Sequence, residues 1–198
     1  MSSDAEIDTK TRILQAAWQL MEERRGQGVS MGEIARATGI SRQAVYLHYP
    51  SRTELVVATI NYVDEVKGLD ARLAQLDSAS TGIELLDMSV EVWGNYIPEI
   101  YGLAKAMMLT RDSDEAMATA WEGCMACLHD AGKAVVEMLA REGKLTTVWT
   151  KAEAIDLINT LLSISHWEQL TLESGWTNKQ YVERMKRLLR QVLLKHEG

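Results

Sequence analysis

Four residues between positions 41 and 49 carry side chains that could read the edges of nucleic-acid bases. They are Arg42, Gln43, Tyr46 and Leu47. At helical spacing they fall outside the face that carries Val45 and Tyr49. Arginine pairs bidentately with guanine, glutamine pairs with adenine, and an apolar side chain contacts the thymine methyl, each good bidentate pair giving roughly 1–3 kcal/mol of discrimination. The segment is therefore predicted to be a helix suited to the DNA major groove.

The residues before this helix complete a helix-turn-helix pattern. In SMGEIARATGISRQAVYLHY (residues 30–49), a short helix carries Ile34 and Ala35 on its inner face and is followed by a tight turn at 38–40. Gly39 suits a positive φ in that turn, and Ser41 can cap the next helix. The turn thus positions the helix that carries the four outward side chains.

A basic segment surrounds this pattern. From position 24 to 52 the chain has five arginines (24, 25, 36, 42 and 52) and one acid, Glu33, which gives a local charge of +4 (5 − 1). The whole chain carries −7, so the other residues sum to −11 (−7 − 4). A local basic patch on an acidic protein is typical of a phosphate-binding footprint, and the alternative is a chance fluctuation on a solvated surface.

Two cysteines offer a different chemistry. Cys124 and Cys127 lie three apart inside a long helical pattern, without the strand-to-helix start of a thioredoxin-like site or the second CxxC of structural zinc. The histidines at 48, 129, 166 and 196 form no i, i+4 ligand pair, and we find no Walker loop, GxGxxG, GxSxG or HExxH. We expect no enzyme, no catalytic residue, no metal and no cofactor. The alternatives are a thiol-based redox or metal sensor, or an oxidoreductase, using the two cysteines, and a helical adaptor without DNA binding.

Composition bounds the class of protein. The 198 residues are 46% hydrophobic and include only two prolines, which leaves room for a core and for long helices. No stretch of 18 apolar residues predicts a membrane span, and the polar, acidic first residues do not resemble a signal peptide. Two cysteines without a secretion signal favour a reducing cytoplasm.

Helix boundaries are marked by five Ser or Thr residues with Glu or Gln three positions later, the pattern of a capping box. The pairs are Ser30/Glu33, Ser51/Glu54, Thr81/Glu84, Thr150/Glu153 and Thr177/Gln180. Gly26, Gly143 and Gly175 fit helix ends. Between these marks the apolar period is three to four, so we predict an all-α fold of about nine helices. Their approximate ranges are 9–25, 31–38, 42–48, 52–75, 81–96, 98–110, 113–142, 151–174 and 178–196.

The segment from Thr11 to Leu55 resembles the DNA-binding head of the tetracycline-repressor (TetR) family. The resemblance rests on ILQAAWQLMEERRG and on VSMGEIARATGISRQAVYLHYPSRTEL, above all on the run from Tyr46 to Tyr49. Arg52 stands where the family usually has lysine, and Tyr49 where it often has phenylalanine. The body is only generically similar, with SHWEQLTLESGWTNKQYVERM resembling the last two helices of many members.

The resemblance implies a helix-turn-helix DNA-binding domain at 1–55 and a ligand-binding and dimerisation domain at 56–198. It implies that the residues matching the recognition helix face the groove: Ser41, Arg42, Gln43, Tyr46 and Leu47. Phosphate contacts are implied for Tyr46, His48 and Arg52, and an approach to the DNA backbone for Ser30 and Met31. The function it implies is a transcriptional regulator, usually a repressor, that binds double-stranded operator DNA.

Two C-terminal helices are predicted to hold a homodimer, because 154–167 is apolar around much of its helix and 178–196 carries an apolar stripe. The expected interface residues are Ile158, Leu161, Leu162, Trp167, Tyr181, Met185, Leu188, Leu189 and Val192. Two heads would then match a palindrome with half-sites roughly 34–36 Å apart per helical turn. The alternative is that both helices pack wholly within one chain.

Large apolar side chains in the middle of the body suggest a pocket for a small, mostly apolar or aromatic effector. They are Met88, Trp93, Tyr96, Tyr101, Met107, Met108, Trp121 and Met125. For any one of them, plain core packing is the alternative. We expect the ligand to shift the fourth helix, alter the spacing of the heads and release the DNA.

Overall fold

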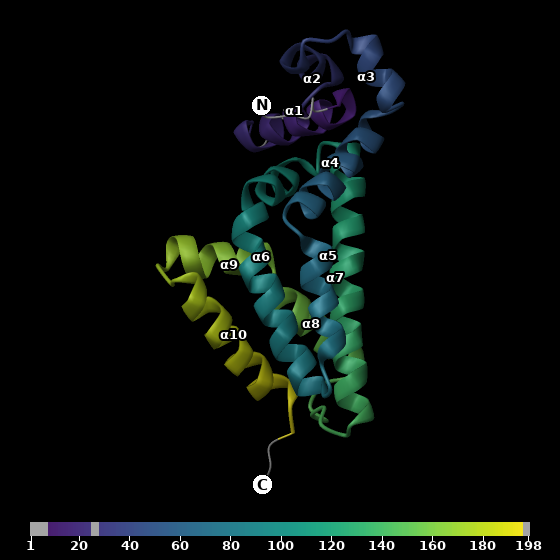
Figure 1. The fold of residues 1–198 in the computed structure, drawn as a ribbon. Helices are drawn as coiled ribbons and strands as arrows, with labels where there is room; N and C mark the ends of the chain where they lie inside the picture. The colour runs from purple at the N-terminus through teal and green to yellow at the C-terminus, as the bar shows by residue number, and fades with distance from the viewer. Residues whose placement is uncertain (1–7, 25–27, 196–198) are drawn as a thin grey trace, which may run out of the picture. The chain divides into compact units, whose positions relative to one another are not determined.

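The computed structural model describes residues 8–24 and 28–195. The regular elements of these residues are all helical, with one isolated β-bridge between Leu145 and Leu194, and the predicted all-α fold is confirmed. In chain order the helices are α1 (Thr9–Glu23), α2 (Met31–Thr38), α3 (Arg42–His48), α4 (Arg52–Val66), α5 (Leu69–Leu73), η1 (Ala74–Ser78), α6 (Gly82–Thr110), α7 (Glu115–Arg141), α8 (Lys151–Leu161), α9 (Ile164–Glu168), η2 (Gln169–Glu173) and α10 (Asn178–Leu193) (Figure 1).

The chain forms two compact units. One consists of the residues up to Lys67 together with Gly102–Gly123, and the other of Gly68–Tyr101 together with the residues from Cys124 onward. Each of the long helices α6 and α7 contributes to both units. The functional division at residue 55 or 56 stays a prediction.

The first unit is built around the N-terminal helices. Helix α1 contacts α2 and α4, and α2 contacts α3 (Figure 1). The apolar stripe of α1 lies inside this unit, as predicted, with Ile13, Ala17 and Met21 buried. The Arg12 guanidinium donates to the carbonyl of Thr38 across 2.6 Å and so ties α1 to the end of α2.

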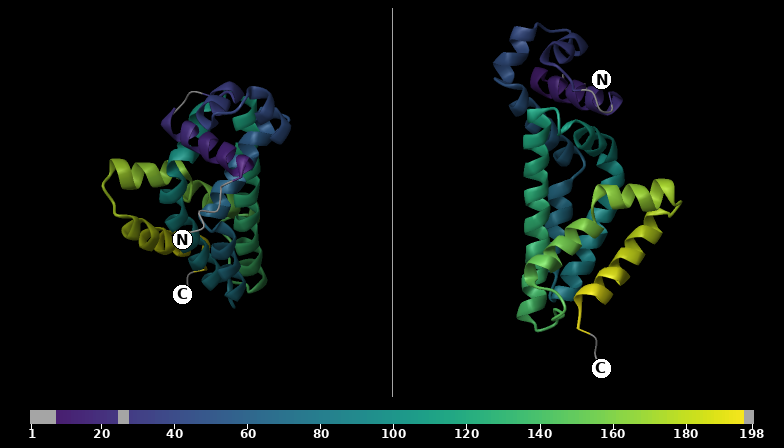
Figure 2. Two further views of the ribbon diagram at one scale, coloured as in Figure 1. Left: turned by 45° about the horizontal axis from the view of Figure 1, so that its top comes forward. Right: turned by 180° about the vertical axis from the view of Figure 1, so that it is seen from behind.

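The second unit packs the C-terminal helices against parts of α6 and α7. Helices α9 and α10 form the arms of an angled hairpin, which both Figure 1 and Figure 2 display. The indole of Trp93 on α6 donates to the carbonyl of Leu162 across 2.7 Å, at the point where α8 ends. This bond satisfies a carbonyl that the helix end leaves without an intrahelical partner.

All five predicted helix starts are capped by the expected hydroxyl, which accepts from the backbone amide three residues later. Three are complete capping boxes, at Ser30, Thr150 and Thr177. The predicted stops at Gly143 and Gly175 have φ of 71° and 75°. Arg25, Gly26 and the predicted helix ends at 25 and 196 lie outside the described residues.

The predicted helix at 52–75 is wrong beyond Val66. Lys67 caps α4, and Gly68 has a φ of 67°, a left-handed conformation that ends a helix. The short helices α5 and η1 follow, and they contain no buried residue. A helical apolar period continued across Gly68, which is why the pattern alone did not reveal the break.

The predicted boundary between 81–96 and 98–110 is also wrong, because α6 continues through Pro98. A proline inside a helix removes one backbone hydrogen bond and costs about 3 kcal/mol. The neighbours Tyr96 and Ile97 are almost completely buried, as are Leu103 and Met107 one or two turns later. We attribute the continuity to this burial on both sides of the proline.

The predicted helix at 151–174 is interrupted at Leu162. Ser163 begins a new helix, because its hydroxyl accepts from the amide of His166 across 3.2 Å. The last turn, η2, is a π-helix. The serine cap was readable in the sequence, but the apolar run around it concealed the break.

Candidate nucleic-acid interface and effector site

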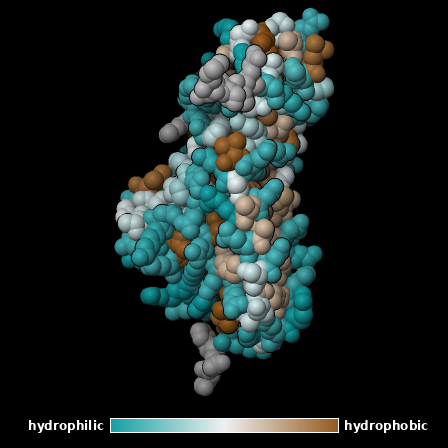
Figure 3. All heavy atoms as spheres, in the orientation of Figure 1, coloured by the Kyte–Doolittle hydropathy of each residue, from teal (hydrophilic) through white to brown (hydrophobic). Residues whose placement is uncertain are grey.

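Helix α3 presents the four candidate base-reading residues to solvent. Ser41 caps the helix by accepting from the Ala44 amide across 3.1 Å, and Val45 is fully buried beneath it. Arg42 and Gln43 are exposed, Tyr46 is 38% exposed and Leu47 is 80% exposed. The space-filling view has a hydrophobic spot over α3 (Figure 3). An apolar side chain so exposed contributes nothing to the core, so it is free to contact a partner.

Arg42 and Tyr46 restrain each other on this surface. The guanidinium donates to the Tyr46 hydroxyl across 3.2 Å and lies 5.5 Å from the centre of its ring. Such cation–π contacts are worth about 0.5–1 kcal/mol at exposed sites. The pair therefore holds one donor group near the first turn of α3, while His48 is exposed at its end.

The turn before α3 has the predicted conformation. Gly39 has a φ of 72°, and its amide donates to the carbonyls of Ala35 and Arg36 at the end of α2. A residue with a Cβ atom pays roughly 1–2 kcal/mol in this conformation. The glycine therefore fixes how α3 follows α2.

The start of α2 is organised by Ser30 and Glu33. The Glu33 carboxylate accepts from the Ser30 amide across 2.8 Å and from its hydroxyl across 2.7 Å, and it pairs with Arg24. These hydrogen bonds lower the pKa of Glu33 from about 4.5 to about 2, and the bond from the Ser30 amide makes the largest contribution. Met31, also expected to approach the DNA backbone, is only 3% exposed and belongs to the buried core of this unit.

Arg52 does not project freely from the start of α4. Its Nε donates to the Val29 carbonyl across 2.6 Å, and its Nη1 donates to Asp114 across 2.5 Å. Asp114 lies just before α7, and the sequence did not predict it as a functional residue. Its carboxylate accepts hydrogen bonds from the amides of Ala116 and Met117, which is the pattern of a helix cap. The expected phosphate-binding base therefore has a carboxylate partner within the chain.

The eight candidate effector-binding residues divide between the two units. Met107, Met108 and Trp121 belong to the first unit, and the other five belong to the second. In the second unit the rings of Trp93 and Tyr96 lie 6.0 Å apart. Tyr101 packs 5.2 Å from the ring of Trp167 and donates its hydroxyl to Glu168 across 2.7 Å.

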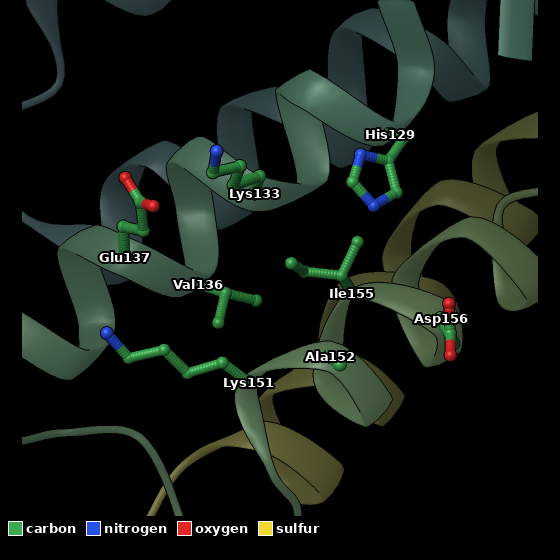
Figure 4. A pocket seen from close by; sticks show the side chains of 8 residues that line it. All are labelled: His129, Lys133, Val136, Glu137, Lys151, Ala152, Ile155 and Asp156. Carbon is green, nitrogen blue, oxygen red and sulfur yellow. The ribbon is translucent and has the colours of Figure 1, made fainter. Parts of the chain in front are cut away.

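Helices α7 and α8 enclose a different hollow, of about 330 Å³, in the second unit. Val136 and Ile155 point toward each other between the two helices, with charged side chains around them (Figure 4). The full lining is His129, Lys133, Val136, Glu137, Lys151, Ala152, Ile155 and Asp156. None of the eight candidate effector-binding residues is among them.

Most of the expected dimer residues are covered by their own chain. Six are buried, namely Ile158, Leu162, Trp167, Tyr181, Met185 and Leu189. Leu161, Leu188 and Val192 are half-buried. Only these last three therefore keep substantial apolar surface for a partner subunit.

Comparison with known proteins identifies the head. Residues 13–59 match the sequence model of a family described as "Bacterial regulatory proteins, tetR family". The head of the chain is therefore a TetR-family domain. The match covers α2, α3, most of α1 and the first half of α4, which are the elements that build and support the exposed face of α3.

Curated relatives match the chain in one part only. Nucleoid occlusion factor SlmA from Marinomonas sp. (strain MWYL1) is 32% identical over 63 residues, which is 32% of each chain. The same factor from Shewanella baltica (strain OS155) is 29% identical over 65 residues. The chain thus spans about a third of the length of the curated relatives it matches.

Solved structures resemble the chain over nearly all its length. A transcriptional regulator from Saccharomonospora viridis in complex with choline has a TM-score of 0.74 at 15% identity, covering 94% of this chain and 98% of that one. FadR from Bacillus subtilis in complex with stearoyl-CoA has a TM-score of 0.73 at 12% identity, covering 92% and 98%. NalD from Pseudomonas aeruginosa, the secondary repressor of a multidrug efflux pump, has a TM-score of 0.69 at 20% identity, covering 96% and 97%. These likenesses show a shared fold.

Neither cysteine is in a disulfide within the part of the chain that the structure describes, and Cys124 is half-buried while Cys127 is exposed. In the described ranges, no three His, Cys, Asp or Glu side chains gather as metal ligands would. Within the same ranges, no helix has the length and hydropathy needed to cross a bilayer. A sensing role for the cysteines stays a prediction.

Proposed function

We propose that this chain is a ligand-responsive transcriptional repressor, which binds a palindromic DNA operator as a homodimer and releases it when a small, mostly apolar molecule binds. One observation carries the proposal. Arg42, Gln43, Tyr46 and Leu47 all face solvent on α3, while Val45 anchors that helix from beneath. A helix held in this way can enter a major groove with its donors and its apolar tip directed at base edges.

The operator is proposed to be double-stranded and two-fold symmetric, because one head offers little surface for specific binding and a symmetric dimer offers two. The contacts within each head are assigned to Ser41, Arg42, Gln43, Tyr46 and Leu47 for the groove. Ser30, Met31, His48 and Arg52 are assigned to the neighbourhood of the DNA backbone, with Met31 acting from the core of the head to position the start of α2. With DNA as its partner, the protein is proposed to act in the cytoplasm, as a binding protein and not as an enzyme.

The effector is proposed to be small and mostly apolar. The aromatic side chains of Trp93, Tyr96 and Tyr101 in the second unit support this class. Choline and stearoyl-CoA are bound by two regulators of the same fold, and stearoyl-CoA carries a long apolar chain. A NalD-like fold serves a repressor in another bacterium, which supports repression here.

The two functions are proposed to be coupled through helices. Both α6 and α7 contribute to the unit that holds the head and to the unit that holds the aromatic cluster. A ligand that shifts these helices, and α4 with them, would change the spacing of two heads. A coupling of about 1–3 kcal/mol would change DNA affinity by roughly 5- to 150-fold.

Selection of duplexes from a random pool tests the proposal directly. We expect the full chain to enrich a palindrome and to lose affinity steeply as the salt concentration rises. The double variant R42A/Q43A should lose the enriched sequence, whereas R141A, which removes an exposed arginine far along α7, should retain it. Failure of the wild-type chain to enrich any sequence would make the proposal wrong.

A further inference from the structure

The guanidinium of Arg52 is held between a loop and the turn that precedes α7. Nε donates to the Val29 carbonyl, and Nη1 forms an ion pair with Asp114. The Arg52 side chain is 27% exposed and the Asp114 side chain is 13% exposed. All these residues belong to the first unit. The charge of Arg52, the first residue of α4, is thus paired with a carboxylate of the same chain.

Asp114 is a fixed acceptor and not a loosely placed surface acid. Its Oδ1 accepts from the amides of Ala116 and Met117 across 3.1 and 3.2 Å, besides accepting from Arg52. Burial alone would raise the pKa of Asp114, but the hydrogen bonds from Arg52 and the Met117 amide outweigh it and hold the pKa below its ordinary value. The carboxylate is therefore ionised at neutral pH.

The loop before α2 fits closely over this pair. A Cβ atom on Gly28 would lie 2.7 Å from Oδ2 of Asp114, so the loop backbone packs closely against the carboxylate and a larger residue would displace it. The Nη2 atom of Arg52 is buried and has no hydrogen-bond partner. An arginine whose buried Nη2 amino group is unused is incompletely satisfied, and an anion with more oxygens can satisfy it better.

Carboxylate and phosphate oxygens compete for the same donors of arginine, since both match its planar fork. We propose that Asp114 occupies Arg52 as an internal substitute for a DNA phosphate, so that the arginine must leave Asp114 before it can bind the operator backbone. The inference rests on the proposed function and adds a regulatory residue to it. Because Asp114 lies in the turn between α6 and α7, a movement of that turn changes which acceptor Arg52 has.

The variant D114N isolates the charge of this carboxylate. Asparagine also caps helices well, so α7 should keep its start while Arg52 loses its anionic partner. We expect D114N to bind the selected duplex at least about threefold more tightly at low salt, with a log–log salt slope steeper by about 0.9 for each Arg52 that gains a phosphate. Unchanged or weaker binding with the wild-type slope would overturn the inference.

A charge-matched control lies two residues away. Asp112 is on the same turn and its side chain is 95% exposed, so D112N makes the same change in net charge without touching Arg52. If D112N strengthens binding as much as D114N, the effect is general electrostatics and the inference fails. Thermal melts establish that the variants are folded, and D114S replaces D114N if the latter melts below the assay temperature.

A double-mutant cycle completes the experiment. R52Q should weaken DNA binding less in the wild-type background, where Asp114 competes with the phosphate for the arginine, than in D114N, where it should abolish the gain. An equal loss in both backgrounds would overturn the competition. Wild-type binding with no response to D114N refutes only this inference, while the absence of duplex binding by every variant refutes the proposed function as well.

Discussion

The smallest unit of the proposed recognition surface is the contact between Arg42 and Tyr46. Their hydrogen bond and ring contact restrict the arginine before any DNA is bound, and Leu47 stands beside them with most of its surface in water. A restrained side chain loses less rotamer freedom when it binds. The exposed side chains of α3 therefore differ in how far they are already ordered.

Replacing Arg42 tests its assigned role in base readout. We expect R42A to weaken binding to the selected operator by about 1–3 kcal/mol and to relax the preference at one base position in each half-site. Y46F keeps the aromatic ring under the guanidinium and removes only the hydroxyl, so its effect should be smaller. Fluorescence anisotropy with single-base variants of the operator measures both, and equal loss on every sequence would contradict base readout.

Glu33 predicts a pH dependence of stability. Its pKa is lowered in the folded chain from about 4.5 to about 2, so its contribution is complete above pH 4.5 and is lost as the pH falls toward 2. The variant E33Q keeps an acceptor for the Ser30 amide but carries no charge. Denaturant titrations should give a stability difference between wild type and E33Q that shrinks over this pH range; a constant difference would argue against the lowered pKa.

At the scale of the helix, the sequence predicted starts much better than interruptions. A start depends on one hydroxyl and one amide three residues apart, so Ser30, Thr150 and Thr177 could be read directly. The continuity of α6 through Pro98 depends on the burial of both flanks, which is a property of packing. The break at Gly68 likewise depends on a backbone conformation that the apolar period does not encode.

The same limit applies to the candidate site. The outward face of α3 follows from helical spacing around Val45, and each predicted residue on it is exposed. Asp114 could not be predicted, because its partner Arg52 is 62 residues away and only the folded chain brings them together. Local chemistry is legible in a sequence, whereas the pairing of distant charges is decided by tertiary structure.

Two glycines with opposite backbone requirements provide a prediction at this scale. Gly39 has a φ of 72° with open space around its Cα, so G39A should destabilise the chain by about 1–2 kcal/mol through backbone strain alone. Gly123 lies inside α7, also with open space, so G123A should stabilise by about 0.5–1 kcal/mol through helix propensity. Denaturant unfolding measures both signs. A stabilising G39A would contradict the turn geometry.

In the whole molecule, most of the apolar surface of the C-terminal helices is buried within the chain itself. Tyr181 and Leu189 of α10 are completely buried, and Trp167 is almost completely buried. Sequence periodicity identified these faces as apolar but could not say whether one chain or two would cover them. A dimer built on α8 and α10 must therefore depend on the half-buried positions that remain.

The proposed dimer contact can be tested at its half-buried leucines. Leu161 and Leu188 are half-buried on α8 and α10, so L161E/L188E should place unpaired charges in the proposed subunit contact and favour monomers, because burying an unpaired charge is costly. L73E, on an exposed face of α5, is the matched control and should leave the oligomeric state unchanged. Sedimentation at several concentrations measures the association constant.

Monomers should also lose the preference for a palindrome over a single half-site, since that preference requires two heads held together. If the double variant remains a dimer as tight as wild type, the subunits meet through another face. The two α3 helices of the dimer would then have to be held together by a different arrangement of the body.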